Sequence, residues 1–182
     1  MSVLEPPVRL PRFTVTTLDG DELTSTALEV GLVQLSFHRY AACPVCSARL
    51  AEYRVHHGQL APARVVWFFH SPVDKIRRYL PNGAPFTIAA DPDFEVYRQF
   101  GITRGVGVVA SPGAMLAAIA ATTRGYGVGL DVDGTAIMRP ADFLVRDGVV
   151  VRAHYGRHMG DSWSVSAARA AIAECADVAP AR

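Results

Sequence analysis

The sequence has few cysteines and almost no excess of charge. It holds 3 cysteines in 182 residues, too few for a disulfide framework. Its formal net charge is +1, which gives no reason to expect nucleic acid or an anionic membrane as a partner. The first twenty residues lack the apolar core of a secretory signal, because charged residues and prolines interrupt them. We therefore expect a cytoplasmic protein that works in a reducing compartment.

Long hydrophobic runs are also missing. The longest uncharged stretch, residues 105–123, contains Gly107, Pro112, Gly113 and several hydroxyl side chains, which argues against a membrane span. Hydrophobic residues make up 50% of the chain and charged residues 19%, a balance typical of a compact domain with a sizeable core. We expect a single domain over residues 1–182.

Two of the cysteines form a C-x-x-C motif, Cys43-Pro44-Val45-Cys46. It follows an apolar run at residues 31–37 and precedes a helical pattern at residues 47–57. In a cysteine-poor chain, this motif between a strand and a helix indicates redox chemistry. Pro44 suits the first helical position, so the sulfur of Cys43 meets unpaired N–H groups and the positive end of the helix dipole. Both effects lower the pKa of Cys43 and favour its thiolate.

The motif assigns different roles to its two cysteines. Cys46 lies on the same side of the first helical turn as Cys43, so a short disulfide can close between them. We expect Cys43, as the more exposed thiol, to attack and Cys46 to resolve. The alternatives are two buried packing residues or half of a zinc site. The remaining candidate ligands, Cys175 and the adjacent His56 and His57, do not repeat the motif's spacing, so we expect no metal.

Patterns of strand and helix alternate along the chain, with Asp19-Gly20 and Asp147-Gly148 as hairpin turns. Strands are predicted at residues 12–18, 22–24, 32–37, 65–69, 86–89, 141–146 and 149–154. Helices are predicted at residues 24–28, 47–57, 71–80, 91–100, 112–124 and 162–175. Ser71 is the predicted cap of the third of these helices, and Asp91 opens the fourth. This order predicts an α/β fold: an N-terminal β-hairpin and a mixed central sheet with helices on both faces. The C-x-x-C motif then lies at the C-terminal end of a central strand, where open α/β sheets place their sites.

Residues 104–135 depart from this alternation, and we interpret them as a helical insertion. Ser111 caps a helix from Pro112 to about Arg124, and Gly125 ends it. Because this helix is apolar on every side, we expect it to be buried on more than one side. It packs over the active-site edge or against a second subunit, unless it is an ordinary core helix. Cys175 is most simply a packed residue of the last helix, with a resolving role across a dimer as the alternative.

Several short motifs follow one another along the chain: Leu10-Pro11-x-Phe13, Asp19-Gly20, Asp91-Pro92 with Tyr97, Phe100-Gly101, and Pro140-Ala141-Asp142-Phe143-Leu144-Val145 before Asp147-Gly148. In this order they resemble the AhpC/TSA family of peroxiredoxin-like proteins, which belongs to the thioredoxin superfamily. The resemblance covers about residues 10–175, apart from the insertion. It implies a thioredoxin-like fold, often dimeric, in which a cysteine thiolate attacks the peroxide O–O bond and becomes a sulfenic acid. A second thiol then forms a disulfide, which thioredoxin-type donors reduce.

The resemblance also implies roles for individual residues. Cys43 matches the peroxidatic cysteine. Arg139 resembles the arginine before the late strand that holds the thiolate and polarises the peroxide; the alternative is a surface charge at a strand edge. Pro140 resembles the cis-proline that faces the C-x-x-C motif of thioredoxins. The resemblance implies no cofactor.

The chain departs from the family pattern P-x-x-x-[T/S]-x-x-C before the attacking cysteine. Ser36 stands at the proline position and Tyr40 at the hydroxyl position, which binds the peroxide in the family. The phenol of Tyr40 is therefore a candidate for peroxide binding, with simple packing as the alternative. His38 and Arg39 either add positive potential or lie in a solvated loop.

Together these features predict a thiol oxidoreductase that cycles Cys43 and Cys46 between dithiol and disulfide and reduces hydroperoxides. Its expected partners are the hydroperoxide, a thioredoxin-type or other thiol reductant, and a second copy in a homodimer. A thioredoxin-like reductase of protein disulfides is the enzyme alternative. A non-catalytic redox-sensing or interaction module, with residues 112–123 as its interface, is the other.

Overall fold

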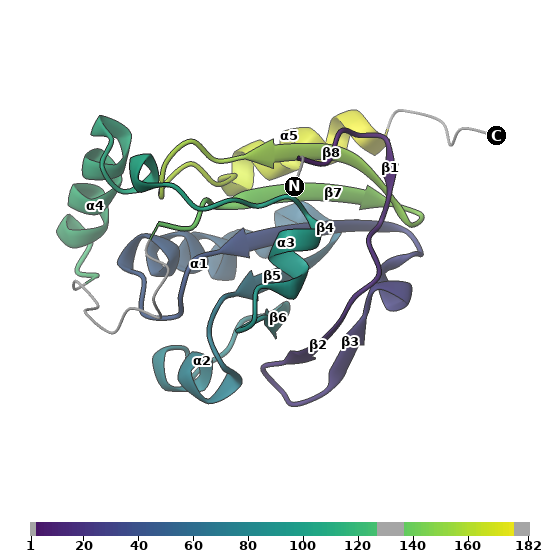
Figure 1. Ribbon diagram of the computed structural model, residues 1–182, viewed down its shortest axis with the longest axis horizontal. Helices are drawn as coiled ribbons and strands as arrows, with labels where there is room; N and C mark the ends of the chain where they lie inside the picture. The colour runs from purple at the N-terminus through teal and green to yellow at the C-terminus, as the bar shows by residue number, and fades with distance from the viewer. Residues whose placement is uncertain (1–2, 127–136, 177–182) are drawn as a thin grey trace.

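The computed structural model describes residues 3–126 and 137–176 (Figure 1). Within these residues, eight strands form one sheet in the order β1-β8-β7-β4-β5-β6-β2-β3. Strands β4, β5 and β6 run parallel to one another, and the other neighbours pair antiparallel. The mixed sheet predicted from the sequence is therefore confirmed. The strands are β1 (Val8–Arg9), β2 (Thr14–Thr17), β3 (Glu22–Thr24), β4 (Leu32–His38), β5 (Arg64–Phe69), β6 (Thr87–Ala90), β7 (Ala141–Arg146) and β8 (Val149–Tyr155).

Helices cover both faces of this sheet. Helix α3 packs on one face, and α1, α2 and α5 pack on the other. In Figure 1, α3 lies in front of the sheet, and α4 stands at the left edge, beyond the C-terminal end of β4. The helices are α1 (Pro44–His56), α2 (Val73–Tyr79), α3 (Glu95–Gln99), α4 (Pro112–Thr123) and α5 (Val165–Ala176), with short 3-10 turns η1 (Ser25–Leu28), η2 (His57–Leu60) and η3 (Val106–Val108).

The central strand β4 carries the chain into the C-x-x-C motif. It pairs with β5 on one side and β7 on the other, so both edges are hydrogen-bonded. Its side chains alternate, with Val33, Leu35 and Phe37 in the core under α3 and Gln34, Ser36 and His38 buried beneath α1 and α5. The sequence indicated a nearly continuous apolar strand, and the structure adds a polar face that is fully covered.

An aromatic cluster fixes the end of β4 nearest the motif. The ring of Phe37 stacks on Phe68 with centroids 4.5 Å apart and meets Tyr97 edge-on at 5.0 Å. The hydroxyl of Tyr97 donates to the carbonyl oxygens of Phe68 at 2.9 Å and of His38 at 2.5 Å. Since such rings bury much apolar area and prefer these geometries, they hold the last residues of β4 firmly below the motif.

Most local signals were right, but the start of α2 was not. The sequence predicted Ser71 as a cap of this helix, whereas Pro72 is the N-cap residue and no side chain caps it. The Ser71 hydroxyl instead accepts the N–H of Ala41 at 3.0 Å. A long-range bond has therefore replaced the local cap, and it ties the loop before Cys43 to the end of β5.

Helix α4 is the main error of the sequence prediction. Ser111 caps it as predicted, accepting the N–H of Ala114 at 3.1 Å. However, its apolar residues are not covered on more than one side, because Met115, Leu116 and Ile119 are 62%, 67% and 54% exposed. The helix lies at the end of the sheet, where α1 and the loop after β8 cover one side of it, so the core-helix interpretation is wrong.

The predicted insertion at residues 104–135 is described only up to residue 126. That part contains η3 and α4, and residues 127–136 lie outside the described ranges. Among the residues that the structure does describe, no helix has the length and apolar character required to cross a membrane.

Candidate redox site

Cys43 is the N-cap residue of α1. Its backbone is extended (φ −71°, ψ 117°), and its sulfur accepts the N–H of Cys46 at 3.3 Å. Its own N–H donates to the carbonyl of Tyr40 at 3.0 Å, and Pro44 begins the helix. The sulfur thus takes the place of the usual capping oxygen, where the free N–H groups and the helix dipole favour negative charge.

A buried arginine contacts the same sulfur. Arg39 lies between β4 and α1, is 3% exposed, and donates from Nη2 to Cys43 Sγ at 3.0 Å. Its carbonyl accepts the N–H of His70 at 2.9 Å, which fixes its backbone against β5. Burial is the largest single influence and acts to lower the pKa of Arg39, but the negative charges of Cys43 and Cys46 and the hydrogen bond to Cys43 together outweigh it and raise that pKa. A guanidinium in this setting stays charged.

The pKa of Cys43 falls from its ordinary value of 9.0 to about 6. Burial is the largest single influence and acts to raise it. A hydrogen bond from the Cys46 thiol, the charge and hydrogen bond of Arg39, and the Cys46 N–H together outweigh burial. At neutral pH Cys43 is therefore mainly thiolate.

The pKa of Cys46 is shifted in the opposite direction to that of Cys43. Burial raises its pKa well above 9.0, and the hydrogen bond that its thiol gives to Cys43 raises it further. The positive charge of Arg39 is a smaller, opposing influence. The pair therefore consists of one thiolate and one thiol that are in contact, which is the asymmetry that a nucleophile and a resolving partner require.

Exposure does not distinguish the two cysteines in the way the sequence analysis expected. Cys43 is 0% exposed and Cys46 is 4% exposed, so the expectation that Cys43 is the more exposed is wrong. Both are free thiols that pack into the apolar cluster beneath α1. The difference between them is electrostatic, because the pKa of Cys43 is lowered and that of Cys46 is raised.

The structure does not bring Arg139 to the sulfur. Its side chain is exposed, and its backbone N–H donates to Thr103 at 3.3 Å. Among the described residues, the guanidinium that contacts the sulfur of Cys43 belongs to Arg39. Tyr40 does lie at the site: it is 5% exposed, and its ring centroid is 5.3 Å from the guanidinium carbon of Arg39.

Pro140 lies at the same end of the sheet as the motif, since Ala141 pairs with Phe37. It is buried, and its carbonyl accepts the N–H of Gly156 at 2.8 Å. The cis peptide bonds in residues 3–126 and 137–176 precede Pro7 and Pro62, so the Arg139–Pro140 bond is trans. The likeness of Pro140 to a cis-proline therefore does not extend to its peptide bond.

A second buried polar network lies on the sheet below α1. The Ser36 hydroxyl donates to Asp142 at 2.5 Å and lies 3.0 Å from Nε2 of His38. Because its single proton goes to the carboxylate, the hydroxyl accepts from His38, which is neutral with its proton on Nε2. Burial lowers the pKa of His38 to about 3, with the charge of Arg49 as the smaller cause. Burial raises the pKa of Asp142, although the hydrogen bonds that it accepts from Ser36 and Trp163 act to lower it.

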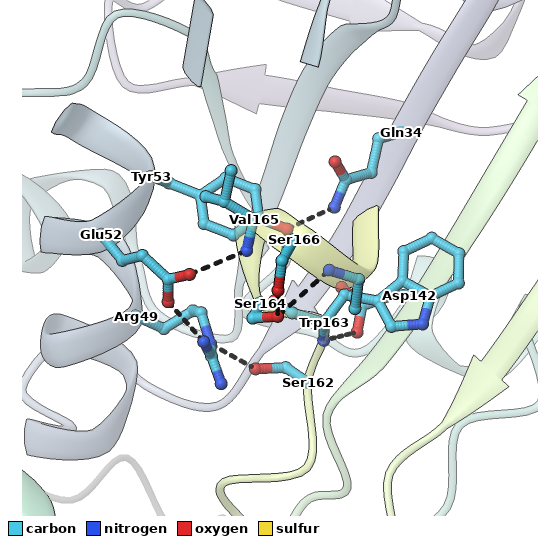
Figure 2. A network of polar contacts seen from close by, with 11 residues as sticks. Gln34, Arg49, Glu52, Tyr53, Asp142, Ser162, Trp163, Ser164, Val165 and Ser166 are labelled. Carbon is cyan, nitrogen blue, oxygen red and sulfur yellow. Dashed lines mark hydrogen bonds and ion pairs between the residues drawn. The ribbon is translucent and has the colours of Figure 1, made fainter. Parts of the chain in front are cut away.

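The same network anchors the segment before α5 (Figure 2). The carboxylate of Asp142 accepts the N–H of Trp163 at 2.7 Å, and Glu52 accepts the N–H of Val165 at 2.9 Å. Tyr53 links this segment to the sheet, because its hydroxyl contacts Gln34 at 2.8 Å and the Trp163 carbonyl at 3.3 Å. The helix that carries Cys46 is thus tied to β4, β7 and α5 through polar side chains.

Comparison with known proteins identifies the family. The sequence model of the AhpC/TSA family matches residues 8–154, which is most of the 182-residue chain. The chain belongs to the AhpC/TSA family. No curated protein matches it. Membership supports thiol-dependent redox activity, in agreement with a thiolate at the start of α1.

Solved structures similar to this AhpC/TSA protein share its thioredoxin-like fold. The peroxidoxin BcpB of Mycobacterium tuberculosis has a TM-score of 0.65 at 19% identity, with 92% of this chain and 96% of that chain covered. A mutant of peroxiredoxin Q of Xanthomonas campestris has a TM-score of 0.61 at 15% identity, with 90% of each chain covered. A proposed protein disulfide isomerase of Bacteroides thetaiotaomicron has a TM-score of 0.59 at 16% identity, with 97% and 93% covered.

Cys175 is half-buried at the end of α5, against the apolar cluster beneath that helix. Within residues 3–126 and 137–176, no group of three or more His, Cys, Asp or Glu side chains is arranged to hold a metal ion.

Sequence reasoning gave too little weight to Arg39 and missed the roles of Ser36 and Asp142. The available signal was position: Arg39 lies between an apolar strand and two alanines, where a charge is buried unless it has a partner. Asp142 likewise interrupts an apolar strand. Neither pattern names the partner: Arg39 meets Cys43 only through the shape of the loop between them, and the partners of Asp142 come from other elements.

Proposed function

We propose that the protein reduces hydroperoxides through a dithiol–disulfide cycle of Cys43 and Cys46. The observation that carries this proposal is the Cys43 sulfur, which accepts hydrogen bonds from Arg39 at 3.0 Å and the Cys46 N–H at 3.3 Å, with a pKa of about 6. A thiolate populated at neutral pH beside a fixed positive charge is suited to attack on an O–O bond.

The first step transfers two electrons from sulfur to the peroxide. The Cys43 thiolate attacks one peroxide oxygen, an S–O bond forms, the O–O bond breaks, and the alkoxide or hydroxide takes a proton to leave as alcohol or water. Arg39 then faces charge that moves from sulfur to the departing oxygen, and a guanidinium stabilises both. This gives Arg39 the role that the resemblance assigned to Arg139.

The second step closes the disulfide. Cys46 loses its proton and attacks the Cys43 sulfenic acid, so an S–S bond forms and the S–O bond breaks, releasing water. A thiol donor, of the thioredoxin type or smaller, returns two electrons and two protons. Tyr40, beside Arg39, is our candidate to contact the peroxide, and Pro140 our candidate to border the bound substrate. We expect the cycle to operate in the cytoplasm, which cell fractionation tests.

Stopped-flow oxidation by hydrogen peroxide tests this function. We expect the reduced protein to react at least about a hundredfold faster than free cysteine at pH 7, because its thiolate is populated and paired with Arg39. Mass spectrometry should then find a Cys43–Cys46 disulfide. Cys46→Ser should stop at the sulfenic acid, Cys43→Ser should not react, and Cys175→Ser is the matched control. A rate no faster than that of free cysteine would rule out the peroxidase.

A reductase of protein disulfides is the second candidate. The C-x-x-C pair at a helix N-terminus favours it, as does the position of Tyr40 where the family pattern has threonine or serine. The same assay series separates the two functions, since a reductase turns over insulin disulfides with a thiol donor and consumes little peroxide. A redox sensor would be oxidised reversibly and would turn over neither substrate.

We further propose that α4 mediates a homodimer. Its exposed apolar face comprises Met115, Leu116 and Ile119, and Pro112–Thr123 contains no charged residue that would repel a second copy. Light scattering should therefore give twice the chain mass for the protein and one chain mass for Leu116→Glu. Val55→Glu, at an exposed valine on α1, is the control that should remain dimeric. A monomeric parent protein would contradict the proposal.

A further inference from the structure

A pocket of about 170 Å³ lies between α1, α4 and the loop after β8. One wall is formed by Val45 and Ala48 of α1, and the opposite wall by Ala117 and Ala120 of α4. The walls are lined with small side chains, so the space between the two helices stays open. Ligand pockets for drug-sized molecules measure about 300–1,000 Å³, so this one suits a smaller molecule.

The charged residues that line the pocket carry a net positive charge. Arg49, Arg124 and Glu52 line it, together with the hydroxyl of Ser162. Both oxygens of the Glu52 carboxylate are engaged, because Oε1 accepts the N–H of Val165 and Oε2 accepts from Arg49. The single negative charge is therefore held in the wall, and the lining keeps one positive charge in excess.

The two guanidinium groups differ in how they are held. Arg49 has a side chain that is 22% exposed, and it is fixed by Glu52 and by Ser162, with 3.4 Å from its Nε to the Ser162 hydroxyl. Arg124 follows the last turn of α4 and is exposed. Within residues 3–126 and 137–176, its side chain has no ion pair or hydrogen-bond partner. One positive group is thus fixed in the wall, and a second is free to close on an anion.

We propose that this pocket binds a small organic carboxylate. Its apolar walls accept a short hydrocarbon or aromatic body, and the arginines accept the carboxylate in the planar, forked geometry that guanidinium favours. The proposal commits to carboxylate chemistry because the unpaired charge of the lining is positive and its polar donors are guanidinium and hydroxyl groups.

The position of the pocket connects it to the redox site. Val45 lies between the two cysteines of the motif and also lines the pocket. Gly160 lines it from the loop, and a Cβ there would lie 2.5 Å from Cβ of Ala117 and 3.7 Å from Cγ1 of Val45. A bound carboxylate would therefore lie beside the C-x-x-C motif rather than on the sulfur of Cys43. We expect this carboxylate to belong to an acidic hydroperoxide or to an acidic thiol reductant. This consequence rests on the proposed redox cycle, whereas binding itself does not.

Calorimetry with benzoate and its neutral analogue benzamide tests binding on the reduced protein, without turnover. We expect benzoate to bind about tenfold more tightly than benzamide, since one charge-assisted pair distinguishes them. Arg124→Gln should weaken benzoate binding about five- to tenfold and leave benzamide unchanged, and Ala120→Leu should weaken both by filling the space. Arg98→Gln, at an exposed arginine of α3, is the control. Equal binding of the two probes, or no effect of Arg124→Gln, would overturn the proposal.

Kinetics with Arg124→Gln then distinguish the two sources of carboxylate. If the acidic group belongs to the reductant, the variant slows re-reduction by mercaptopropionate about fivefold but not by mercaptoethanol. If it belongs to the peroxide, the variant slows oxidation by a carboxylated alkyl hydroperoxide but not by hydrogen peroxide. Either result supports the proposal. A variant that slows mercaptoethanol and mercaptopropionate equally would contradict it, even if Cys43 proves reactive.

Discussion

Replacing Arg39 with glutamine is expected to raise the pKa of Cys43 above its present value of about 6, with only the hydrogen bonds from Cys46 left to lower it. Burial would then act on the thiolate without the charge and hydrogen bond of the guanidinium. At pH 7 the thiolate fraction would therefore fall below its present value of about nine-tenths. A more basic thiolate is a better nucleophile, which restores part of the loss, so we expect oxidation to slow about ten- to hundredfold.

Thiolate absorbance against pH measures this shift directly, and stopped-flow oxidation gives the rate. Arg139→Gln is the matched control: its side chain is exposed, and we expect it to leave the pKa of Cys43 unchanged. A large shift in Arg139→Gln with none in Arg39→Gln would show that the resemblance had identified the correct arginine and that the contact to Arg39 is incidental.

The same pair makes the stability of the reduced protein depend on pH. The pKa of Cys43 is lower in the folded chain, about 6, than its ordinary value of 9.0, so the stabilisation is complete above pH 9 and is lost as pH falls through 6. Three pH units correspond to about 4 kcal/mol of unfolding free energy. Urea unfolding at pH 9 and pH 6 should reveal this slope in the parent protein, and Cys43→Ser should remove it.

Asp142→Leu is expected to lower the free energy of unfolding by about 3 kcal/mol. The carboxylate accepts from Ser36 at 2.5 Å and from the Trp163 N–H at 2.7 Å, and it is 0% exposed. Its loss leaves a buried hydroxyl and a partly buried N–H without an acceptor, which costs about 1–3 kcal/mol for each group. Urea unfolding of the reduced protein measures the difference.

The control for this substitution is Asp93→Leu, at an exposed aspartate, which should change stability by less than about 0.5 kcal/mol. Adding Ser36→Ala removes the hydroxyl that Asp142→Leu leaves without an acceptor. The double variant should therefore be more stable than the sum of the two single losses predicts. A loss below about 1 kcal/mol for Asp142→Leu would mean that water replaces the carboxylate and that the network does not anchor α5.

Local signals in the chain predicted much of the fold. Asp19-Gly20 and Asp147-Gly148 form the hairpin turns as predicted, with positive φ at Gly20, Asp147 and Gly148. Asp91 lies just before α3, which begins at Glu95, and accepts three N–H groups at the start of that helix, from Glu95, Val96 and Tyr97. These features depend on residues close together in sequence, so turn chemistry and capping were sufficient to find them.

Predictions that needed a long-range partner were weaker. Ser71 looks like a helix cap, but its hydroxyl bonds to Ala41, far earlier in the chain. Helix α4 looks like a core helix because its sequence is apolar throughout, yet the fold places it at the end of the sheet with one side exposed. Apolar composition indicates what a helix is able to bury, and only the neighbouring elements determine what it does bury.

The sequence by itself determined that a cysteine caps a helix at the end of a buried strand, because strand pattern, proline and C-x-x-C spacing are local. Only the tertiary structure decided which arginine meets that sulfur and that both thiols are enclosed. Arg39 reaches Cys43 because β4 and α1 fold back on each other and bury the loop between them, whereas Arg139 ends in solvent. The two residues are only four apart in the sequence, but the strength of their interaction depends on distance and burial, which the packing of this loop against β5 and the helices sets.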